Sequence, residues 1–172
     1  MAGFLFLDRL LLIYYNEYID WNKEQVTLKR IYVVNGPNMN LLGSREPEKY
    51  GNMSLKELES LIRKKTDSAQ LSVTFFQSNH EGELIDYMQK IEPESYVVLN
   101  PAGLSHTSVS LRDCVAAVGF KAIEVHISNI FAREEFRAKS LLSGVCVGVV
   151  SGLGVSGYLL AIDWIINNCQ KN

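Results

Sequence analysis

The side chains best suited to acid–base chemistry in this 172-residue chain are its three histidines. His80 and His106 each follow a short apolar run within a polar loop, and His126 ends a third run. Imidazole changes charge near neutral pH and is the commonest general acid or base in enzymes. The polar loops that follow buried strands gather along one edge of an α/β sheet, where such sheets bind ligands. The pattern therefore indicates an enzyme.

A carboxylate and two arginines accompany the last histidine. Glu124 and His126 are two residues apart on a predicted strand, so their side chains share a face. The carboxylate can fix the tautomer of the imidazole and keep it protonated as a general acid; a purely structural charge pair is the alternative. Arg133 and Arg137 are four apart on a predicted helix and can point the same way, although solvated ion pairs with neighbouring glutamates would explain them equally.

Two polar loops add amides and hydroxyls. Residues 35–51 contain three asparagines within six positions, then Arg45 and Tyr50 among glycines and prolines. This composition predicts a mobile flap over a site, and a surface loop with turn-forming residues is the alternative. Asn100–Ser108 leads from a strand to a helix start and would suit hydroxyls or an anion. The alternative there is a helix cap by Ser105 or Thr107.

The segment Gly152–Gly157 fits the spacing GxGxxG, which is typical of dinucleotide-binding turns. In that motif, however, the glycines follow the first strand, and a further strand carries an acidic residue about 20 positions later. Here they follow the last predicted strand, and the sequence ends at Asn172. We predict instead that these glycines let the last helix lie close to the sheet.

The chain alternates between two kinds of apolar pattern. Short runs rich in Val, Ile and Phe predict five strands: Ile31–Val34, Leu71–Phe76, Tyr96–Leu99, Ala122–Ile127 and Gly144–Val150. Longer stretches with helical spacing predict helices: Ser54–Asp67, Glu81–Ile91, Thr107–Val118, a shorter one around Arg133–Leu142, and Gly157–Cys169. The alternation predicts an α/β domain whose parallel sheet is covered on both faces through right-handed crossovers.

Composition excludes several classes of protein. A hydrophobic content of 47% and a charged content of 21% are ordinary for a soluble domain. The net charge of −2, with no basic block, argues against nucleic-acid binding. The three cysteines lack metal-ligand spacing and lie in apolar patterns, so we expect them to be reduced and buried in a cytoplasmic protein. No histidine–cysteine cluster indicates a metal site.

Residues 1–30 differ from the rest of the chain. Their two apolar runs are interrupted by Asp8 and Arg9, so they are too short to cross a membrane. They also lack the pattern of a secretory signal. Three interpretations stay open: an additional amphipathic helix, a disordered tail, or a segment that is not translated. We therefore treat residues 31–172 as the single domain and 1–30 as an atypical extension.

Five ordered segments together resemble the type II 3-dehydroquinate dehydratase family, from Ile31 to about Trp164. They read NGPNMNLLGSREPEKYG, FQSNHEGELID, NPAGLSHTSVSLRD, EVHISNIFAREEFR and SGLGVSGYLLA. Departures are small, with Met39 where Leu is common and Leu104 where Tyr is frequent. The resemblance implies a flavodoxin-like, doubly wound five-stranded sheet of order 2-1-3-4-5 and a homododecamer built as a tetramer of trimers. It also implies anti elimination of water from 3-dehydroquinate in the shikimate pathway, without metal or cofactor.

The resemblance also assigns roles to residues. Tyr50 would be the base, ionised near Arg45, and Asn38 would position the water that stabilises an enolate. His126, oriented by Glu124, would protonate the leaving hydroxyl. The expected substrate-binding groups are Asn100, the backbone of Ile127 and Ser128, His106, Arg137, and Asp113 of a neighbouring subunit.

The proposed base is physically reasonable. A free tyrosine, with a pKa of about 10, is ionised in only about one part in a thousand at pH 7. A nearby guanidinium favours the phenolate, and Arg45 is five residues before Tyr50 in the same loop. The competing hypothesis is an FMN- or nucleotide-binding module on the same architecture. It would need a phosphate-cradling loop rich in Ser, Thr or Gly after the first strand, and Asn35–Leu41 lacks that composition.

Overall fold

The computed structural model describes residues 30–44 and 52–169. These residues form one parallel five-stranded sheet in the order β2-β1-β3-β4-β5, as predicted. The strands are β1 (Ile31–Asn35), β2 (Val73–Gln77), β3 (Tyr96–Asn100), β4 (Lys121–His126) and β5 (Gly148–Ser151). The order reverses between β1 and β3, which is where doubly wound sheets bind their ligands.

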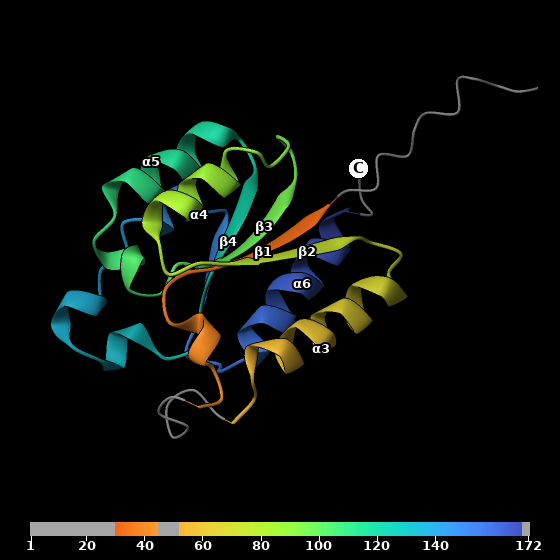
Figure 1. Cartoon of the computed structure of the whole chain (residues 1–172), viewed down its shortest axis with the longest axis horizontal. Helices are drawn as coiled ribbons and strands as arrows, with labels where there is room; N and C mark the ends of the chain where they lie inside the picture. The colour runs from red at the N-terminus through yellow and green to blue at the C-terminus, as the bar shows by residue number, and fades with distance from the viewer. Residues whose placement is uncertain (1–29, 45–51, 170–172) are drawn as a thin grey trace, which may run out of the picture.

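Two pairs of helices cover the two faces of the sheet (Figure 1). The helices α4 (Glu81–Met88) and α5 (Val109–Val118) lie on one face, and α3 (Leu55–Ser68) and α6 (Ser156–Cys169) lie on the other. Alternate residues of each strand therefore enter different cores. In β1, Ile31 and Val33 pack with the core under α3 and α6, whereas Tyr32 and Val34 pack with the core under α4 and α5.

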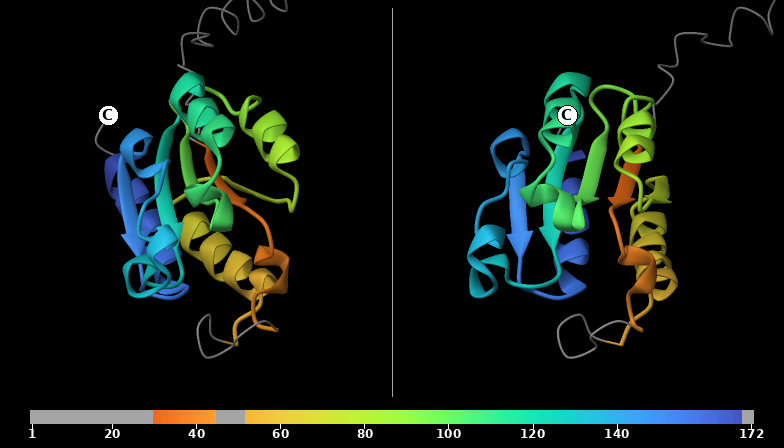
Figure 2. Two further views of the ribbon diagram at one scale, coloured as in Figure 1. Left: turned by 90° about the vertical axis from the view of Figure 1, so that its left-hand side faces the viewer. Right: turned by 60° about the vertical axis from the view of Figure 1, so that its left-hand side comes forward.

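The strand register aligns polar residues at one edge. Asn35, the last residue of β1, pairs with Asn100, the last residue of β3, and His126 of β4 pairs with Ser151 of β5. All strands are parallel, so their carboxyl ends face the same side, as the arrowheads in Figure 2 show. The sheet thus brings Asn100 and His126, both predicted for the site, to the same edge.

Local sequence signals account for several helix ends. Ser54 and Glu57 form the predicted capping box at the start of α3, where the Ser54 side chain accepts a hydrogen bond from the Glu57 N–H. Helix α5 begins later than predicted, because Ser108, not Ser105 or Thr107, accepts the hydrogen bond from the Leu111 N–H. Helix α4 ends at Met88, three residues earlier than predicted, ahead of Pro93.

The prediction of a helix around Arg133–Leu142 is wrong. The backbone at Arg133 is extended, and only the 3-10 turn Glu135–Arg137 follows it. Ser140 and Leu141 instead make hydrogen bonds to distant segments, which compete with the helical pattern. The fifth strand is also shorter than predicted, since Ser143–Val145 forms another 3-10 turn before β5.

The glycines after β5 do what the sequence predicted. A Cβ atom at Gly157 would lie 3.3 Å from Val150 Cγ1 and 3.4 Å from Val125 Cγ1, so α6 approaches the sheet closely there. Gly152 has φ +86°, and a side chain there would meet Asn129 at 2.8 Å. Within the described ranges, no helix combines the length and apolar character needed to span a membrane.

Candidate active site

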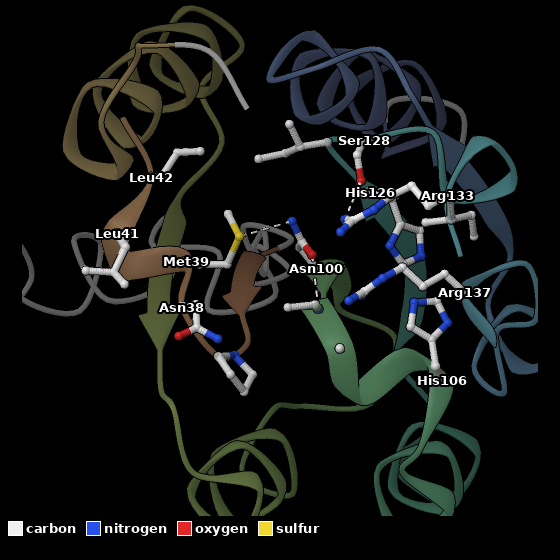
Figure 3. Close-up of a pocket in the computed structure, with 15 residues that line it drawn as sticks. Asn38, Met39, Leu41, Leu42, Asn100, His106, His126, Ser128, Arg133 and Arg137 are labelled. Carbon is white, nitrogen blue, oxygen red and sulfur yellow. Dashed lines mark hydrogen bonds between the residues drawn. The ribbon is translucent and has the colours of Figure 1, made fainter. Parts of the chain in front are cut away.

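A pocket of about 160 Å³ opens at the carboxyl edge of the sheet. Figure 3 shows Asn38, Met39, Leu41 and Leu42 on one side of it, and His106, His126 and two arginines on the other. Asn100 lies between the two sides. The lining residues are Pro37, Asn38, Met39, Leu41, Leu42, Asn100, Ala102, Gly103, His106, His126, Ile127, Ser128, Ile130, Arg133 and Arg137.

The Glu124–His126 pair forms the buried end of the pocket. His126 Nε2 lies 2.8 Å from Glu124 Oε1, and the side chains are 5% and 0% exposed. Burial alone would raise the pKa of Glu124, but hydrogen bonds from His126, Ser140 and Ser143 outweigh it and leave the pKa lowered. An ionised carboxylate only accepts hydrogen bonds, so Nε2 carries a hydrogen and Nδ1 remains for a ligand. The sequence prediction of a shared face is confirmed.

His106, on a different element of the fold, is also held by a hydrogen bond to one of its ring nitrogens. It belongs to the 3-10 turn Ala102–His106, and its Nδ1 lies 2.9 Å from the carbonyl oxygen of Lys139. A carbonyl oxygen only accepts, so Nδ1 is the donor and Nε2 is left for a ligand. The imidazole rings of His106 and His126 stack with centroids 6.1 Å apart. Each ring therefore has one nitrogen committed to the protein.

Asn100 is held by a buried phenol. Its Nδ2 donates to Tyr158 Oη at 2.8 Å, and Tyr158 Oη donates in turn to Asn35 Oδ1 at 2.6 Å. Its Oδ1 accepts from the Ala102 N–H at 3.1 Å, and Nδ2 also approaches Met39 Sδ at 3.5 Å. Burial raises the pKa of Tyr158, so this hydroxyl stays protonated. The amide is thus oriented before any ligand binds.

Asn38 lies on the opposite side of the pocket, in the loop that follows β1. Its backbone is left-handed, with φ 68°, an uncommon conformation for a residue other than glycine. The Asn38 N–H donates to Asn79 Oδ1 at 2.8 Å, and that oxygen also accepts from Gln77 Nε2 at 3.2 Å. The Asn79 side chain, just after β2, therefore holds the backbone N–H of Asn38.

The glycine turn after β5 orients two backbone amides beside the pocket. The Gly152 N–H donates to the His126 carbonyl at 3.1 Å, and the Gly154 N–H donates to the Ile127 carbonyl at 2.9 Å. In a trans peptide the N–H points opposite to the C=O. The Ile127 and Ser128 N–H groups therefore point away from the glycine turn, and both residues line the pocket. Paired N–H groups of this kind suit a carboxylate.

The charge of the pocket favours an anion. Two arginines and two histidines line it, and among the described lining residues none is acidic. Arg133 Nη1 donates to Ser128 Oγ at 3.2 Å. Arg137 Nε donates to Glu134 at 2.8 Å, so the predicted ion pairs with neighbouring glutamates also form. Although the predicted helix is absent, both guanidinium groups reach the same pocket.

The other predicted residues lie elsewhere. Asp113 is exposed on α5, where it pairs with Arg112 at 2.8 Å, and it does not line the pocket of its own chain. Arg45 and Tyr50 lie outside the described residues. Within the described ranges, no group of three or more His, Cys, Asp or Glu side chains could hold a metal ion.

Sequence reasoning missed several residues that support the site. These are Ser140 and Ser143 on Glu124, Tyr158 on Asn100, and Asn79 on Asn38. Serine and asparagine are frequent in loops, and their partners are far away in the chain, so spacing alone gave no signal. Tyr158 could have been suspected, because a phenol in an apolar helix face needs a hydrogen-bond partner.

Comparison with known proteins identifies the family: the chain belongs to the Dehydroquinase class II family, whose model matches residues 29–166. A relative from Halothermothrix orenii named 3-dehydroquinate dehydratase is 47% identical over 145 residues, which is 84% of this chain and 98% of that protein. One of the same name from a Janthinobacterium species is 51% identical over 140 residues, covering 80% and 97%. The crystal structure of type II dehydroquinase from Propionibacterium acnes has a TM-score of 0.78 at 37% identity, covering 81% and 97%.

Proposed function

We infer that this chain is a type II 3-dehydroquinate dehydratase, a hydro-lyase that removes water from 3-dehydroquinate to give 3-dehydroshikimate in the shikimate pathway. The observation that carries this inference is the buried Glu124–His126 pair beside a cationic pocket in a chain of this family. Such an elimination requires a pocket that binds an anionic substrate and an acid that protonates the leaving hydroxyl.

The reaction proceeds in two steps. In the first, the Tyr50 phenolate, stabilised by Arg45, takes a proton from the carbon beside the ketone, and the C–H electrons form an enolate. A water held by Asn38 donates to the enolate oxygen. In the second step the enolate reforms the ketone, the C–O bond breaks, and His126 gives its proton to the departing hydroxyl, which leaves as water. Proton, electrons and leaving group balance without a redox partner.

The remaining groups bind the substrate. The Ile127 and Ser128 N–H groups and Asn100 receive the carboxylate, and their orientation by the glycine turn and by Tyr158 supports this role. His106 and Arg137 bind ring hydroxyls, for which His106 Nε2 is the nitrogen left by its bond to Lys139. The described pocket residues that follow β1, from Pro37 to Leu42, include no Ser, Thr or Gly of the kind that cradles a phosphate, so a flavin- or nucleotide-binding module is the weaker candidate.

The proposal extends to assembly and location. Twelve copies would assemble as a tetramer of trimers, with Asp113 reaching the pocket of a neighbouring chain; its exposed position on α5 is compatible with this role. Large apolar side chains such as Phe131 and Phe136, 70% and 62% exposed, would be covered by neighbours. The three cysteines are free, which suits the reducing cytoplasm; Cys114 and Cys169 are buried as expected, whereas Cys146 is only half-buried. Residues 1–30 are the extension outside this domain.

The test of the activity follows the enone absorbance of the product with 3-dehydroquinate as substrate. The purified chain should be active, and Tyr50→Phe should lower turnover by orders of magnitude while the thermal unfolding midpoint stays close to the wild-type value. Full activity of Tyr50→Phe would remove the proposed base. Absence of product with the folded wild-type protein would overturn the assigned reaction.

A further inference from the structure

The segment Lys139–Ser143, here called the serine strap, makes hydrogen bonds to His106 itself and to Glu124, the partner of His126. Its Lys139 carbonyl accepts from His106 Nδ1. Its two serine hydroxyls donate to the two oxygens of Glu124, Ser140 to Oε1 and Ser143 to Oε2, each at 2.6 Å. One short segment therefore fixes both imidazoles, one directly and one through a carboxylate.

The Glu124 carboxylate is satisfied entirely by neighbouring protein groups. It is fully buried, yet Oε1 accepts from His126 and Ser140 while Oε2 accepts from Ser143. A buried carboxylate stays ionised only when donors replace the water it has lost. Two of these three donors come from the strap.

We propose that Ser140 and Ser143 are positioning residues for the elimination: their hydroxyls hold the Glu124 carboxylate behind His126, so that His126 donates from Nε2 to Glu124 and acts on the substrate through Nδ1. This proposal rests on the proposed function. It adds two residues that do not touch the pocket and act only through the carboxylate.

Backbone hydrogen bonds hold the serine strap so that its hydroxyls point at Glu124. Ser140 Oγ accepts from the Leu142 N–H at 3.1 Å and from the Ser143 N–H at 3.3 Å, which leaves its own hydrogen for Glu124. The Leu141 N–H donates to the Ser105 carbonyl at 2.8 Å, and so ties the strap to the turn that carries His106. The strap is held in place by backbone bonds, so its hydroxyls need no reorganisation when a substrate arrives.

Few other groups could balance the charge of Glu124. Leu99 and Val149 lie beside it in the register of β3 and β5, and both are apolar. Cys146 is the titratable group nearby on the strap side, and burial, with Glu124 adding to it, raises the pKa of its thiol to about 12. The thiol therefore stays neutral. Beside His126, the pocket is lined by one further histidine and two arginines, His106, Arg133 and Arg137.

Loss of a serine donor changes the pH at which Glu124 takes up a proton. The hydrogen bonds from His126, Ser140 and Ser143 lower the pKa of Glu124 against the opposing effect of burial. Removing a serine donor raises that pKa, so the carboxyl takes up a proton at a higher pH. The acid side of the activity profile should then move toward neutral pH, because a protonated Glu124 is a weaker acceptor for the His126 Nε2–H and holds the imidazole less firmly.

Ser143→Ala is the sharpest variant, since the Ser143 hydroxyl donates to Glu124 while Ser140 also accepts two backbone bonds. We expect kcat to fall about tenfold, as when outer partners of an active-site ligand are removed, with KM within about twofold. The acid limb of kcat against pH should move upward. Ser143→Thr keeps a hydroxyl and should recover part of the loss. Ser60→Ala, an exposed serine of α3 on the other face of the sheet, is the matched control.

Three outcomes decide the proposal. In a Glu124→Gln background, Ser143→Ala should have no further effect on the pH profile, because the serine acts through the carboxylate. In the folded wild-type protein, the His126 Nε2–H should give a slowly exchanging downfield proton resonance between about pH 5 and 8. An active wild-type enzyme with an unchanged pH profile in Ser143→Ala, or no such resonance, would overturn the role of the serines, whereas an inactive wild-type chain would overturn the assigned reaction instead.

Discussion

The two sides of the pocket hold their polar side chains differently. The strand side consists of Glu124, His126 and the two residues that follow, at the end of β4. The loop side consists of residues 38–42, after β1. On the strand side His126 is 5% exposed and Glu124 is fully buried, whereas Asn38 on the loop side is exposed.

The two sides also differ in the number of hydrogen bonds that hold their polar groups, and the buried strand side has more. Glu124 accepts three side-chain hydrogen bonds from a strand neighbour and the serine strap. The left-handed backbone of Asn38 is fixed from outside its own loop through the Asn79 amide oxygen. A carboxylate that stays ionised in the protein interior needs several hydrogen-bond partners, whereas the group proposed to position a water has a defined backbone conformation and stays accessible.

The largest expected effect is on the strand side, for His126→Ala. Loss of a general acid should lower kcat by about 100- to 10,000-fold. The second step should suffer most, so hydrogen exchange at the carbon beside the ketone should continue while product formation stops. Solvent deuterium incorporation into recovered 3-dehydroquinate, followed by mass spectrometry, measures this.

The third histidine supplies the matched control for that substitution. His80 is exposed at the start of α4, and its side chain makes no capping hydrogen bond. His80→Ala should leave kcat within about twofold, as surface substitutions usually do. Equal losses in the two variants would contradict the assignment of the acid to the strand side.

The next effect concerns stability on the strand side, for Glu124→Gln. Because the folded-state pKa of Glu124 is lowered, its charge stabilises the fold above the ordinary carboxyl range, and this stabilisation is lost as pH falls through the lowered pKa. The amide should lower the free energy of unfolding at neutral pH by about 1–3 kcal/mol. It should also flatten the acid dependence in urea unfolding at several pH values. Glu135→Gln, at an exposed position, is the comparison variant. An equally steep acid loss in Glu124→Gln would contradict the lowered pKa.

On the loop side, Asn79→Ala removes the oxygen that accepts from the Asn38 N–H and from Gln77. The left-handed conformation of Asn38 then loses its support. We expect kcat to fall about tenfold, equivalent to a hydrogen bond of about 1.4 kcal/mol, with little change in the unfolding midpoint. Asn79→Asp keeps the acceptor and should stay near the wild-type rate. A rate loss in the aspartate variant as large as in the alanine variant would show that the acceptor oxygen is not what matters.

The fold followed from the sequence because its signals were local or periodic. Apolar runs located all five strands, and the Ser54–Glu57 capping box located the start of α3. The helix expected around Arg133–Leu142 failed because the Ser140 hydroxyl donates to Glu124 and the Leu141 N–H donates to the Ser105 carbonyl, and no periodicity within the segment reveals such partners. Tertiary contacts there overrode a weak local preference.

Only part of the site could be predicted from the sequence. The Glu124–His126 pair could be read from a spacing of two on one strand, and the structure confirms it. Its serine partners are 16 and 19 residues away in the chain, and that distance carries no pattern. The left-handed backbone at Asn38 likewise depends on Asn79, 41 residues away. The residues proposed to act on the substrate could be named from the sequence, whereas the residues that hold them became visible only in three dimensions.

The smallest expected effect is for Met39→Leu, which tests whether the loop side also acts through side-chain packing. Met39 is 8% exposed, and its sulfur is 3.5 Å from Asn100 Nδ2. Leucine has about the same volume, so the unfolding free energy should change by less than about 1.5 kcal/mol and kcat by less than about twofold. Tyr158 and Ala102 still hold the Asn100 amide. Met39→Ala, by contrast, leaves a cavity and should cost about 2–5 kcal/mol. A KM that changes several-fold in Met39→Leu would contradict this expectation. It would mean that the Met39 sulfur competes with the substrate carboxylate for the Asn100 N–H. The loop side would then affect substrate binding through Asn100, in addition to its proposed role in positioning water.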